Sequence, residues 1–329
     1  MRKIDKEKVK KILFITLSNV GDVILTTPVL EVLAGEFPDA VSDILVGPQG
    51  KDVFMGHERV REIIIYDKKA SWAEKFKLFL RLLKNRYDMV VDLRNTVLPI
   101  VLFPKYKTNP LRHKKKKSLH KKDIHLSRVK EMGIDTSRSR IRIPVPEEDR
   151  AYVDKLLCSL GSMPFVILGP GAKSHVKRWP LKNFAKLADN IKKELSHETI
   201  LIGDDKDKVV IQRILFYMKT KPINFIEKTN IRQLAYLIKK AKLLITNDSA
   251  PLHAGSAVGA PILAFFGPTD EKKYGPAGNG KSKVLRKNLK CAPCEVAQCV
   301  NYGNKYECLN AISVEEAFRA VKELLGGNR

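Results

Sequence analysis

The sequence predicts an α/β protein made of two doubly wound domains that face each other across an interdomain cleft. Short apolar runs rich in β-formers alternate with helical patterns along the chain, as in parallel sheets flanked by helices. The alternation restarts after a proline-containing break around residues 141–164, and each half opens with a strand, a glycine loop and a helix. A chain of 329 residues with 44% hydrophobic residues can form two cores. We place the N-terminal domain at residues 1–157 and the C-terminal domain at 158–329.

The first half contains four apolar runs of strand length, separated by helical segments. We expect strands at residues 11–17, 42–46, 60–66 and 88–93. A helix is expected over 72–85, where large apolar side chains recur at helical spacing. We expect these side chains to lie in the core: Trp72, Phe76, Phe79, Leu80 and Leu83.

The second half repeats the pattern. We expect strands at 165–168, 198–203, 242–247 and 261–267, and an amphipathic helix at 181–195. A last helix is expected at 313–325, because Ser313 is followed three residues later by Glu316, the spacing of a capping box. The pattern does not assign this last helix to either domain.

The charge of the chain indicates an anionic partner. Lys and Arg number 61 against 36 Asp and Glu, a net charge of +25, which attracts nucleic acid, anionic membranes or phosphorylated substrates. Residues 105–122 alone hold eight Lys and one Arg with no acid, so they form either a solvated loop or a loop that contacts an acidic acceptor or lipid headgroups. Nucleic acid ranks lower, because the sequence has no zinc-finger, homeodomain or RNP signature.

Membrane-spanning and secreted classes are not expected. No apolar run approaches the roughly 20 residues that span a bilayer. The N-terminal apolar stretch has strand length and is followed by no small-residue cleavage site. We therefore expect a cytoplasmic protein.

A single carboxylate stands out in "LSNVGDVILTTPVL", residues 17–30. Asp22 follows Gly21, just after an expected strand and at the start of an expected helix. Such a residue can serve as a helix cap. It can also lie at the carboxyl edge of a sheet, where open α/β folds bind ligands. Both interpretations remain open at this point.

The segment "GPGAKSHVKRWP", residues 169–180, has the features of an anion-binding loop. It follows a strand and precedes a helix, and its glycines, including Gly171, let a ligand approach the backbone. Lys173, Lys177 and Arg178 add positive charge. The alternative is a solvated loop, because the segment matches neither a Walker A motif nor GxGxxG.

The segment "TNDSAPLHAGSAVGAP", residues 246–261, gathers polar groups at a helix N-terminus. Asn247, Asp248 and Ser249 end a strand and can cap the next helix, and His253 follows within that helix. This set suits a diphosphate and its sugar, because the positive end of the helix dipole offsets the charge of a leaving group. Taken alone, His253 is more often a hydrogen-bonded structural residue.

Four of the five cysteines cluster near the C-terminus. Cys291, Cys294, Cys299 and Cys308 have the spacing C-x2-C-x4-C-x8-C, and Cys158 lies far from them in sequence. The spacing is compatible with a structural zinc. A disulfide and free thiols remain the alternatives.

Taken together, these segments resemble one family. "LSNVGDVILTTPVL", "VVDLRN" (90–95), "GPGAKSHVKRWPLKNFAKLA" and "TNDSAPLHAGSAVGAPILAFFGPTD" are similar, in this order and spacing, to glycosyltransferase family 9, the ADP-heptose:lipopolysaccharide heptosyltransferases. The cysteine segment resembles the heptosyltransferase II branch. The resemblance covers nearly the whole chain.

The resemblance implies a GT-B type fold of two Rossmann-like domains, with the acceptor on the N-terminal domain and the nucleotide-sugar on the C-terminal one. It implies an inverting transfer of heptose from ADP-heptose to the inner core of lipopolysaccharide, with no cofactor required for catalysis. The implied partners are the ADP-sugar, an anionic lipid-linked acceptor and, through peripheral contact, the inner leaflet of the inner membrane. No nucleic acid is expected.

The resemblance also assigns roles to residues. Asp22 matches the general base, Lys177 matches a lysine on the donor diphosphate, and Asp248, Ser249 and His253 match the donor-binding segment. An inverting displacement needs a base on one face of the sugar and anion stabilisation on the other, and these residues would supply both.

Further roles follow from the neighbouring segments. Gly171 belongs to the implied donor loop, and Asp205 takes the place of an acidic residue on the adenosine ribose. Arg94 and the lysines of the basic run are assigned to the acceptor: Lys114, Lys115, Lys116 and Lys117.

Three alternatives stay open. The chain could use another nucleotide-sugar or build another surface glycan within the same family. It could be a basic nucleic-acid-binding protein, whose affinity would fall steeply with salt. It could also be a catalytically inactive sugar-nucleotide binder.

Overall fold

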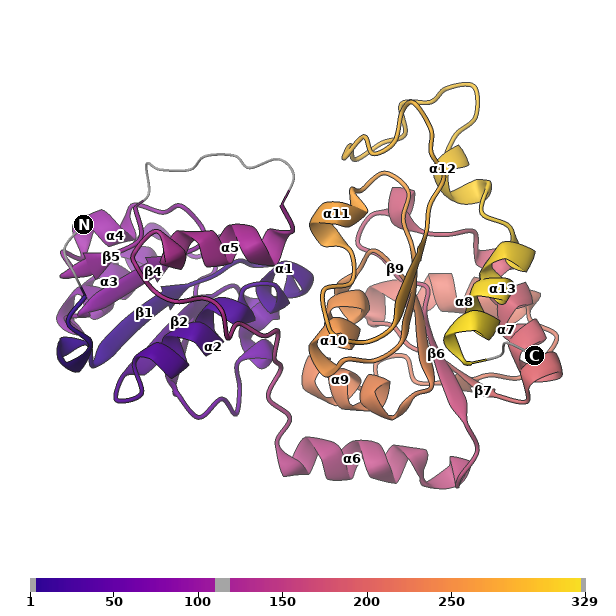
Figure 1. The fold of residues 1–329 in the computed structure, drawn as a ribbon, viewed down its shortest axis with the longest axis horizontal. Helices are drawn as coiled ribbons and strands as arrows, with labels where there is room; N and C mark the ends of the chain where they lie inside the picture. Colours follow the sequence, from indigo (N-terminus) through magenta and orange to yellow (C-terminus); the bar gives the residue numbers. More distant parts are fainter. Residues whose placement is uncertain (1–3, 110–118, 327–329) are drawn as a thin grey trace. The chain divides into compact units, whose positions relative to one another are not determined.

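The computed structural model describes residues 4–109 and 119–326. The chain divides into two compact units, Met1–Pro144 and Val145–Arg329, each built on a parallel sheet (Figure 1). The division precedes helix α6 (Glu147–Leu157), whereas the sequence placed it at 157/158. Helix α6 packs on α9 (Ile231–Lys240), and its Asp149 pairs with Arg232 at 2.5 Å, so this helix belongs to the second unit.

The N-terminal unit contains a parallel sheet in the order β3-β2-β1-β4-β5 over its described residues. The order reverses beside β1, which is the doubly wound arrangement, and the four expected strands are confirmed. The strands are β1 (Lys11–Ile15), β2 (Val41–Val46), β3 (Val60–Ile65), β4 (Met89–Asp92) and β5 (Tyr106–Lys107). The helices are α1 (Val20–Ile24), α2 (Thr27–Glu36), α3 (Trp72–Lys84), α4 (Leu98–Val101) and α5 (Lys121–Lys130).

Helix α3 forms as expected but does not bury the expected residues. Ser71 and Glu74 close its N-terminus with a capping box. Within the helix Leu82 is buried, and Leu78 and Phe79 pack beside it on the cluster over the sheet. The expectation that the other large apolar side chains are core is wrong, because the apolar arc of the helix is wider than the surface it covers. These exposed residues are Trp72, Phe76, Leu80 and Leu83.

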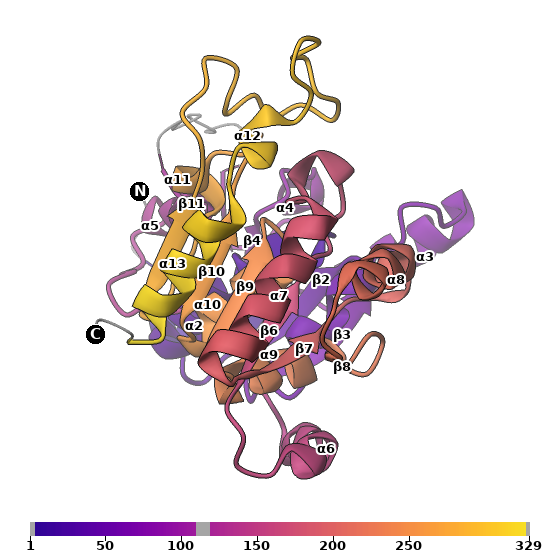
Figure 2. The same ribbon diagram turned by 90° about the vertical axis from the view of Figure 1, so that its right-hand side faces the viewer.

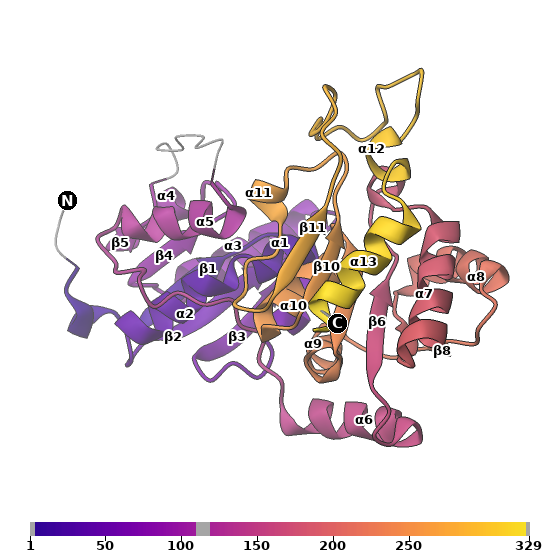
Figure 3. The same cartoon turned by 45° about the vertical axis from the view of Figure 1, so that its right-hand side comes forward.

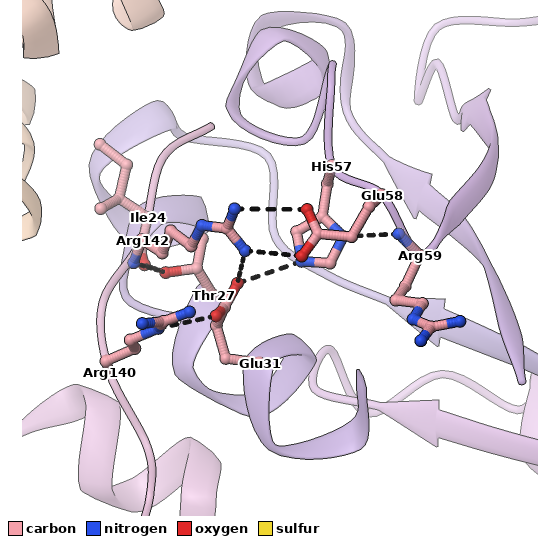
Figure 4. A network of polar contacts seen from close by, with 8 residues as sticks. All are labelled: Ile24, Thr27, Glu31, His57, Glu58, Arg59, Arg140 and Arg142. Atoms are coloured by element: carbon pink, nitrogen blue, oxygen red, sulfur yellow. Dashed lines mark hydrogen bonds and ion pairs between the residues drawn. The ribbon is translucent and has the colours of Figure 1, made fainter. Parts of the chain in front are cut away.

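A buried carboxylate ties the end of the N-terminal unit to helix α2 (Figure 4). Glu31 of α2 is 3.0 Å from His57 Nε2 and 2.9 Å from Arg140 Nε, and it is 3.4 Å from Arg142. Arg142 continues the network to Glu58 at 3.0 Å. These contacts fix segment 140–142 against α2 and against the loop before β3.

The network holds both carboxylates in their charged form. Burial of Glu31 acts to raise its pKa, but the hydrogen bonds from His57 and Arg140 prevail, and the pKa stays below its ordinary value. The hydrogen bonds from Arg142 to Glu58 lower the pKa of that carboxyl to about 2. The network is therefore at full strength only where both acids are ionised.

The C-terminal unit contains a parallel sheet in the order β11-β10-β9-β6-β7-β8, and its order reverses beside β6. The expected strands and the helices at 181–195 and 313–325 are confirmed. The strands are β6 (Phe165–Gly169), β7 (Glu198–Leu201), β8 (Ile223–Asn224), β9 (Leu243–Asn247), β10 (Ile262–Phe265) and β11 (Ser282–Leu285). The remaining helices are α7 (Leu181–Leu195), α8 (Lys208–Tyr217), α10 (Ala250–Val258), α11 (Glu271–Tyr274), α12 (Glu307–Asn310) and α13 (Val314–Leu324).

Helices cover both faces of this second sheet. Helices α7, α8 and α13 pack on one face over a large apolar core, and α9 and α10 lie on the other (Figures 2 and 3). Trp179, fully buried, stacks on Phe265 with ring centroids 4.2 Å apart, and its Nε1 donates to the carbonyl of Ile312 at 3.0 Å. This anchor fixes the end of the 169–180 loop and joins α13 to the second unit.

No helix among residues 4–109 and 119–326 combines the length and the apolar character that a membrane crossing requires.

Candidate functional site

Most of the predicted catalytic and donor-binding residues, and Arg94, follow the two strands at which each sheet reverses its order. In the C-terminal unit these strands are β6 and β9, which pair with each other. In the N-terminal unit they are β1 and β4, which also pair. The carboxyl ends of such strands border the crevice where open α/β sheets bind ligands.

In the C-terminal unit the two predicted donor segments meet through an ion pair. Lys177 lies in the single turn His175–Lys177 after β6, and its Nζ is 2.6 Å from Oδ2 of Asp248, which follows β9. The Asp248 side chain is nearly buried, while that of Lys177 is partly exposed. The ammonium also lies 5.9 Å from the ring centroid of Tyr274. The pair therefore holds a cation at the carboxyl edge of the sheet, with its free side open to a ligand.

Buried polar side chains fix the backbone around this pair. Asn247 accepts a hydrogen bond from the Trp179 N–H at 3.0 Å and donates to the carbonyl of Pro170 at 2.7 Å, so it clamps both ends of the glycine loop. Thr246 Oγ1 donates to the carbonyl of Gly169 at 3.1 Å. These contacts preorganise the loop before any ligand arrives.

Helix α10 directs its N-terminus to the same edge. Ser249 is its N-cap residue, and its hydroxyl lies 3.3 Å from Thr246 Oγ1. His253 follows one turn into the helix and is buried. The free N–H groups of the first turn carry partial positive charge beside Lys177, which is a suitable environment for a phosphate.

Asp207 is a second acidic group at this edge that is not among the predicted site residues. A Cβ on Gly171 would lie 2.2 Å from Oδ2 of Asp207, so the glycine is needed for the close approach of this carboxylate. Burial, and next the charge of Asp204, raise the pKa of Asp207. The run of acids in "GDDKD", just after β7, was the signal that could have pointed to it.

Asp205, which the sequence assigned to the ribose, lies apart from this contact. Its side chain is exposed and pairs with Lys208 at 2.7 Å. The hydrogen bond from Lys208 lowers the pKa of Asp205.

In the N-terminal unit Asp22 lies within the short helix α1 that follows β1. It is partly buried, and its Oδ2 accepts a hydrogen bond from the side-chain amide of Asn19 at 3.0 Å. Asn19 itself is the N-cap residue of α1. Behind the helix the buried hydroxyls of Thr16 and Thr26 are 2.7 Å apart and tie the end of β1 to the start of α2. The amide of Asn19 thus holds Asp22 at the carboxyl edge of the sheet.

Arg94 follows β4, the strand that pairs with β1. Its N–H donates to Oδ1 of the buried Asp92 at 2.7 Å, and its guanidinium lies 4.9 Å from the ring centroid of Tyr66. Asp22 and Arg94 therefore come from the two strands that flank the reversal of this sheet. The other predicted acceptor residues lie outside the described residues: Lys114, Lys115, Lys116 and Lys117.

The four C-terminal cysteines are free thiols that line one pocket together with Val176. Burial and the neighbouring thiols raise the pKa of Cys308 to about 11. Their segment packs against the 169–180 loop, where His175 Nε2 and the Tyr306 hydroxyl are 3.1 Å apart. Among residues 4–109 and 119–326, no three His, Cys, Asp or Glu side chains are arranged to hold a metal ion. The thiols as placed do not form a zinc ligand set.

Known proteins resemble this chain in sequence and in fold. The family model of glycosyltransferase family 9 (heptosyltransferase) matches residues 105–304. Lipopolysaccharide heptosyltransferase 3 of Escherichia coli strain K12 is 27% identical over 343 residues, which cover 93% of this chain and 95% of that protein.

Two solved structures extend the likeness over nearly the whole chain. The glycosyl transferase family 9 protein of Veillonella parvula DSM 2008 is 28% identical with a TM-score of 0.82, covering 96% of this chain and 97% of that one. The ADP-heptose lipopolysaccharide heptosyltransferase II of Escherichia coli is 22% identical with a TM-score of 0.77, covering 96% and 98%. The expected GT-B type of fold is confirmed, and the interdomain cleft stays a prediction.

Proposed function

This chain belongs to glycosyltransferase family 9, the heptosyltransferase family, and we propose that it transfers heptose from ADP-heptose to the inner core of lipopolysaccharide. The observation that carries the proposal is the Lys177–Asp248 pair, placed at the reversal of the second sheet beside the N-terminus of α10. The relatives of known name support the chemistry, because they are lipopolysaccharide heptosyltransferases. Family membership also favours this function over nucleic-acid binding.

On the donor side, Lys177 and the first turn of α10, with Ser249 and His253, bind the diphosphate. Gly171 lets the loop backbone approach the nucleotide. Asp205 is our candidate for the ribose hydroxyls, and Asp207, beside Gly171, is the second candidate. The negative charge that ADP acquires as it leaves is offset by Lys177 and by the helix dipole.

On the acceptor side, Asp22 acts as the general base. The acceptor hydroxyl attacks the anomeric carbon as the bond to the ADP oxygen breaks, its proton passes to the Asp22 carboxylate, and the anomeric configuration is inverted. Arg94 and the lysines at 114–117 bind the anionic groups of a lipid-linked acceptor. This acceptor brings the protein to the cytoplasmic face of the inner membrane as a peripheral protein.

The donor site can be tested by calorimetric titration of the protein with ADP, UDP, GDP and CMP, repeated with Lys177→Ala. We expect preferential binding of ADP that is lost in the variant. Preference for another nucleotide would rule out ADP-heptose as the donor, and binding of ADP that is unchanged in Lys177→Ala would rule out this diphosphate site.

A structural zinc at Cys291, Cys294, Cys299 and Cys308 is a separate proposal that rests on their spacing and shared pocket, and it requires the four thiols to move closer together than this structure places them. Catalysis does not depend on it. Metal analysis of the purified protein, with Cys291→Ser/Cys294→Ser as the control, tests it. We expect about one equivalent of zinc in the parent and none in the variant; a metal-free parent protein of full stability would refute the proposal.

A further inference from the structure

Helix α3 carries a stripe of large apolar side chains that face solvent. Trp72, Phe76, Leu80 and Leu83 follow one another at intervals of four, four and three residues, so they lie along one face of the helix. Their exposed fractions are 87%, 61%, 47% and 40%. Single exposed apolar residues are ordinary, but a continuous stripe that includes a tryptophan indicates a surface that is covered in use.

This stripe adjoins the face by which α3 packs on its own unit. Leu82 is buried, and Leu78 and Phe79 pack on the cluster above the sheet. In Figure 2 the helix projects outward beyond strands β2 and β3 of the same sheet. The helix is thus anchored by one side of its apolar arc and exposes the other side.

Basic side chains border the exposed stripe. Lys77 and Lys84 are exposed and seven residues apart, so they lie along one line beside it. Lys75 lies 5.7 Å from the Trp72 ring centroid. The one acid of the helix, Glu74, is engaged by the Ser71 cap. The border of the stripe is therefore cationic.

A second element with exposed apolar side chains packs on the same cluster as α3. Leu98 and Leu102, in and after α4, pack on the same cluster as α3. Beside them Ile100 and Phe103 are exposed.

We infer that α3 is the helix through which this chain docks on a bilayer that contains anionic lipid. Trp72 and Phe76 enter the boundary between headgroups and acyl chains, and Lys77 and Lys84 contact the lipid phosphates. A convex ridge of aromatic side chains fits a deformable bilayer, whereas a peptide partner needs a groove. The inference rests on the proposed function, because the lipid-linked acceptor of that function is what would bring this chain to a membrane.

The two tryptophans of the chain allow a direct test. Trp72 is 87% exposed and Trp179 is fully buried, so a change of polarity at α3 is reported by Trp72 alone. Vesicles of phosphatidylethanolamine with phosphatidylglycerol should shift the emission of the intact protein to shorter wavelength and shield it from iodide. Trp72→Phe should abolish the shift while the protein still floats with vesicles. Bound protein whose Trp72 remains open to iodide would overturn the inference.

Paired variants distinguish binding through the α3 stripe from nonspecific adsorption to vesicles. Trp72→Ala/Phe76→Ala should lower the vesicle partition coefficient at least about tenfold. Phe216→Ala is the matched control, because this aromatic residue is 83% exposed on α8 of the other unit, and it should bind as the parent does. Lys77→Gln/Lys84→Gln should weaken binding to vesicles with phosphatidylglycerol and reduce the effect of salt. Equal partition of the aromatic variant and the parent would refute the role of α3.

Failure of the membrane-docking inference can be distinguished from failure of the proposed function. Heptose transfer to a delipidated, water-soluble acceptor should be unchanged in Trp72→Ala/Phe76→Ala. An intact vesicle response without any heptose transfer would remove the proposed function alone. Intact heptose transfer without a vesicle response would remove the docking role alone. The same holds if the protein does not bind vesicles but self-associates, and Trp72→Ala/Phe76→Ala abolishes the self-association.

Discussion

Lys177 Nζ lies 2.6 Å from Oδ2 of Asp248, although 71 residues separate the two in sequence. The contact exists because β6 and β9 are neighbours in the sheet, so the loops that follow them end at the same edge. It joins the glycine loop to the N-terminus of α10 and places a cation where a diphosphate would bind.

Removal of the Lys177 cation should weaken donor binding and also slow the chemical step, because the same cation offsets the charge of the departing ADP. Lys177→Ala is expected to raise the KM for the donor about ten- to hundredfold, since a hydrogen bond to a charged group contributes about 1.5–3 kcal/mol. Initial rates over a range of donor concentrations give the value. Lys193→Ala, at an exposed position near the end of α7, is the control and should leave KM unchanged. An unaltered KM in Lys177→Ala would argue against the diphosphate contact.

A methyl group at Gly171 should collide with Asp207. Gly171→Ala is expected to lower the free energy of unfolding by about 0.5–1.5 kcal/mol and to raise the donor KM, because the Asp207 carboxylate must turn away from a Cβ that would lie 2.2 Å from it. Asp207→Ala should recover much of the stability lost in Gly171→Ala, as a double-mutant cycle in urea would show. Gly35→Ala, where a Cβ meets nothing within 4 Å, is the control and should not lower stability, because alanine is favoured over glycine within helix α2. Additive effects of the two substitutions would contradict the predicted clash.

Neutralisation of Asp22 should abolish turnover and spare donor binding. Asp22→Asn keeps the shape and a hydrogen-bonding partner for Asn19, and it is expected to lower kcat about a hundredfold or more, the usual contribution of a general base. Donor affinity by calorimetry should change little, since the proposed donor residues lie in the other unit. Asp39→Asn, at an exposed site paired with Lys10, is the matched control. Equal kcat in Asp22→Asn and the parent would leave Asp22 as a helix-terminal residue only.

Acid should loosen the N-terminal unit through the Glu31 network. The pKa of Glu31 is below its ordinary value and that of Glu58 is about 2, so both carboxylates stabilise the fold above their unfolded pKa of about 4.3. This stabilisation is lost as the pH falls from there towards about 2. Urea unfolding between pH 7 and pH 3 should show the decline, and Glu31→Gln should lower stability at pH 7 by about 1–3 kcal/mol and flatten the decline. If the free energy of unfolding falls with pH as steeply in Glu31→Gln as in the parent, this network is excluded as the source of the decline.

The strands and the site segments could be predicted from sequence because their signals are local. Apolar runs of strand length and the glycine loops after them place Lys177 and Asp248 at strand ends, and parallel pairing then brings these ends together. The Ser313 cap of α13 is likewise local and is confirmed, with its hydroxyl accepting from the Glu316 N–H at 3.1 Å.

What could not be predicted depends on packing between distant segments. Helical spacing in α3 reports which residues share a face, and it does not report how wide a surface the sheet offers, so Trp72 was misplaced in the core. The carboxylate that meets Gly171 is Asp207, and choosing it over Asp205 requires the path of the backbone after β7. The boundary after Pro144 depends on the ion pair from α6 to Arg232, which no local pattern encodes.

The central claim, that this chain transfers heptose from ADP-heptose, is tested most directly by mass spectrometry of the reaction products. Purified protein is incubated with ADP-heptose and a heptose-deficient lipopolysaccharide core acceptor, with Asp22→Asn and Lys177→Ala run in parallel. We predict an acceptor heavier by one heptose, with an equal amount of ADP released, in the parent protein and strongly reduced product in both variants. An unmodified acceptor in the parent reaction, together with transfer from a different nucleotide-sugar, would contradict the claim.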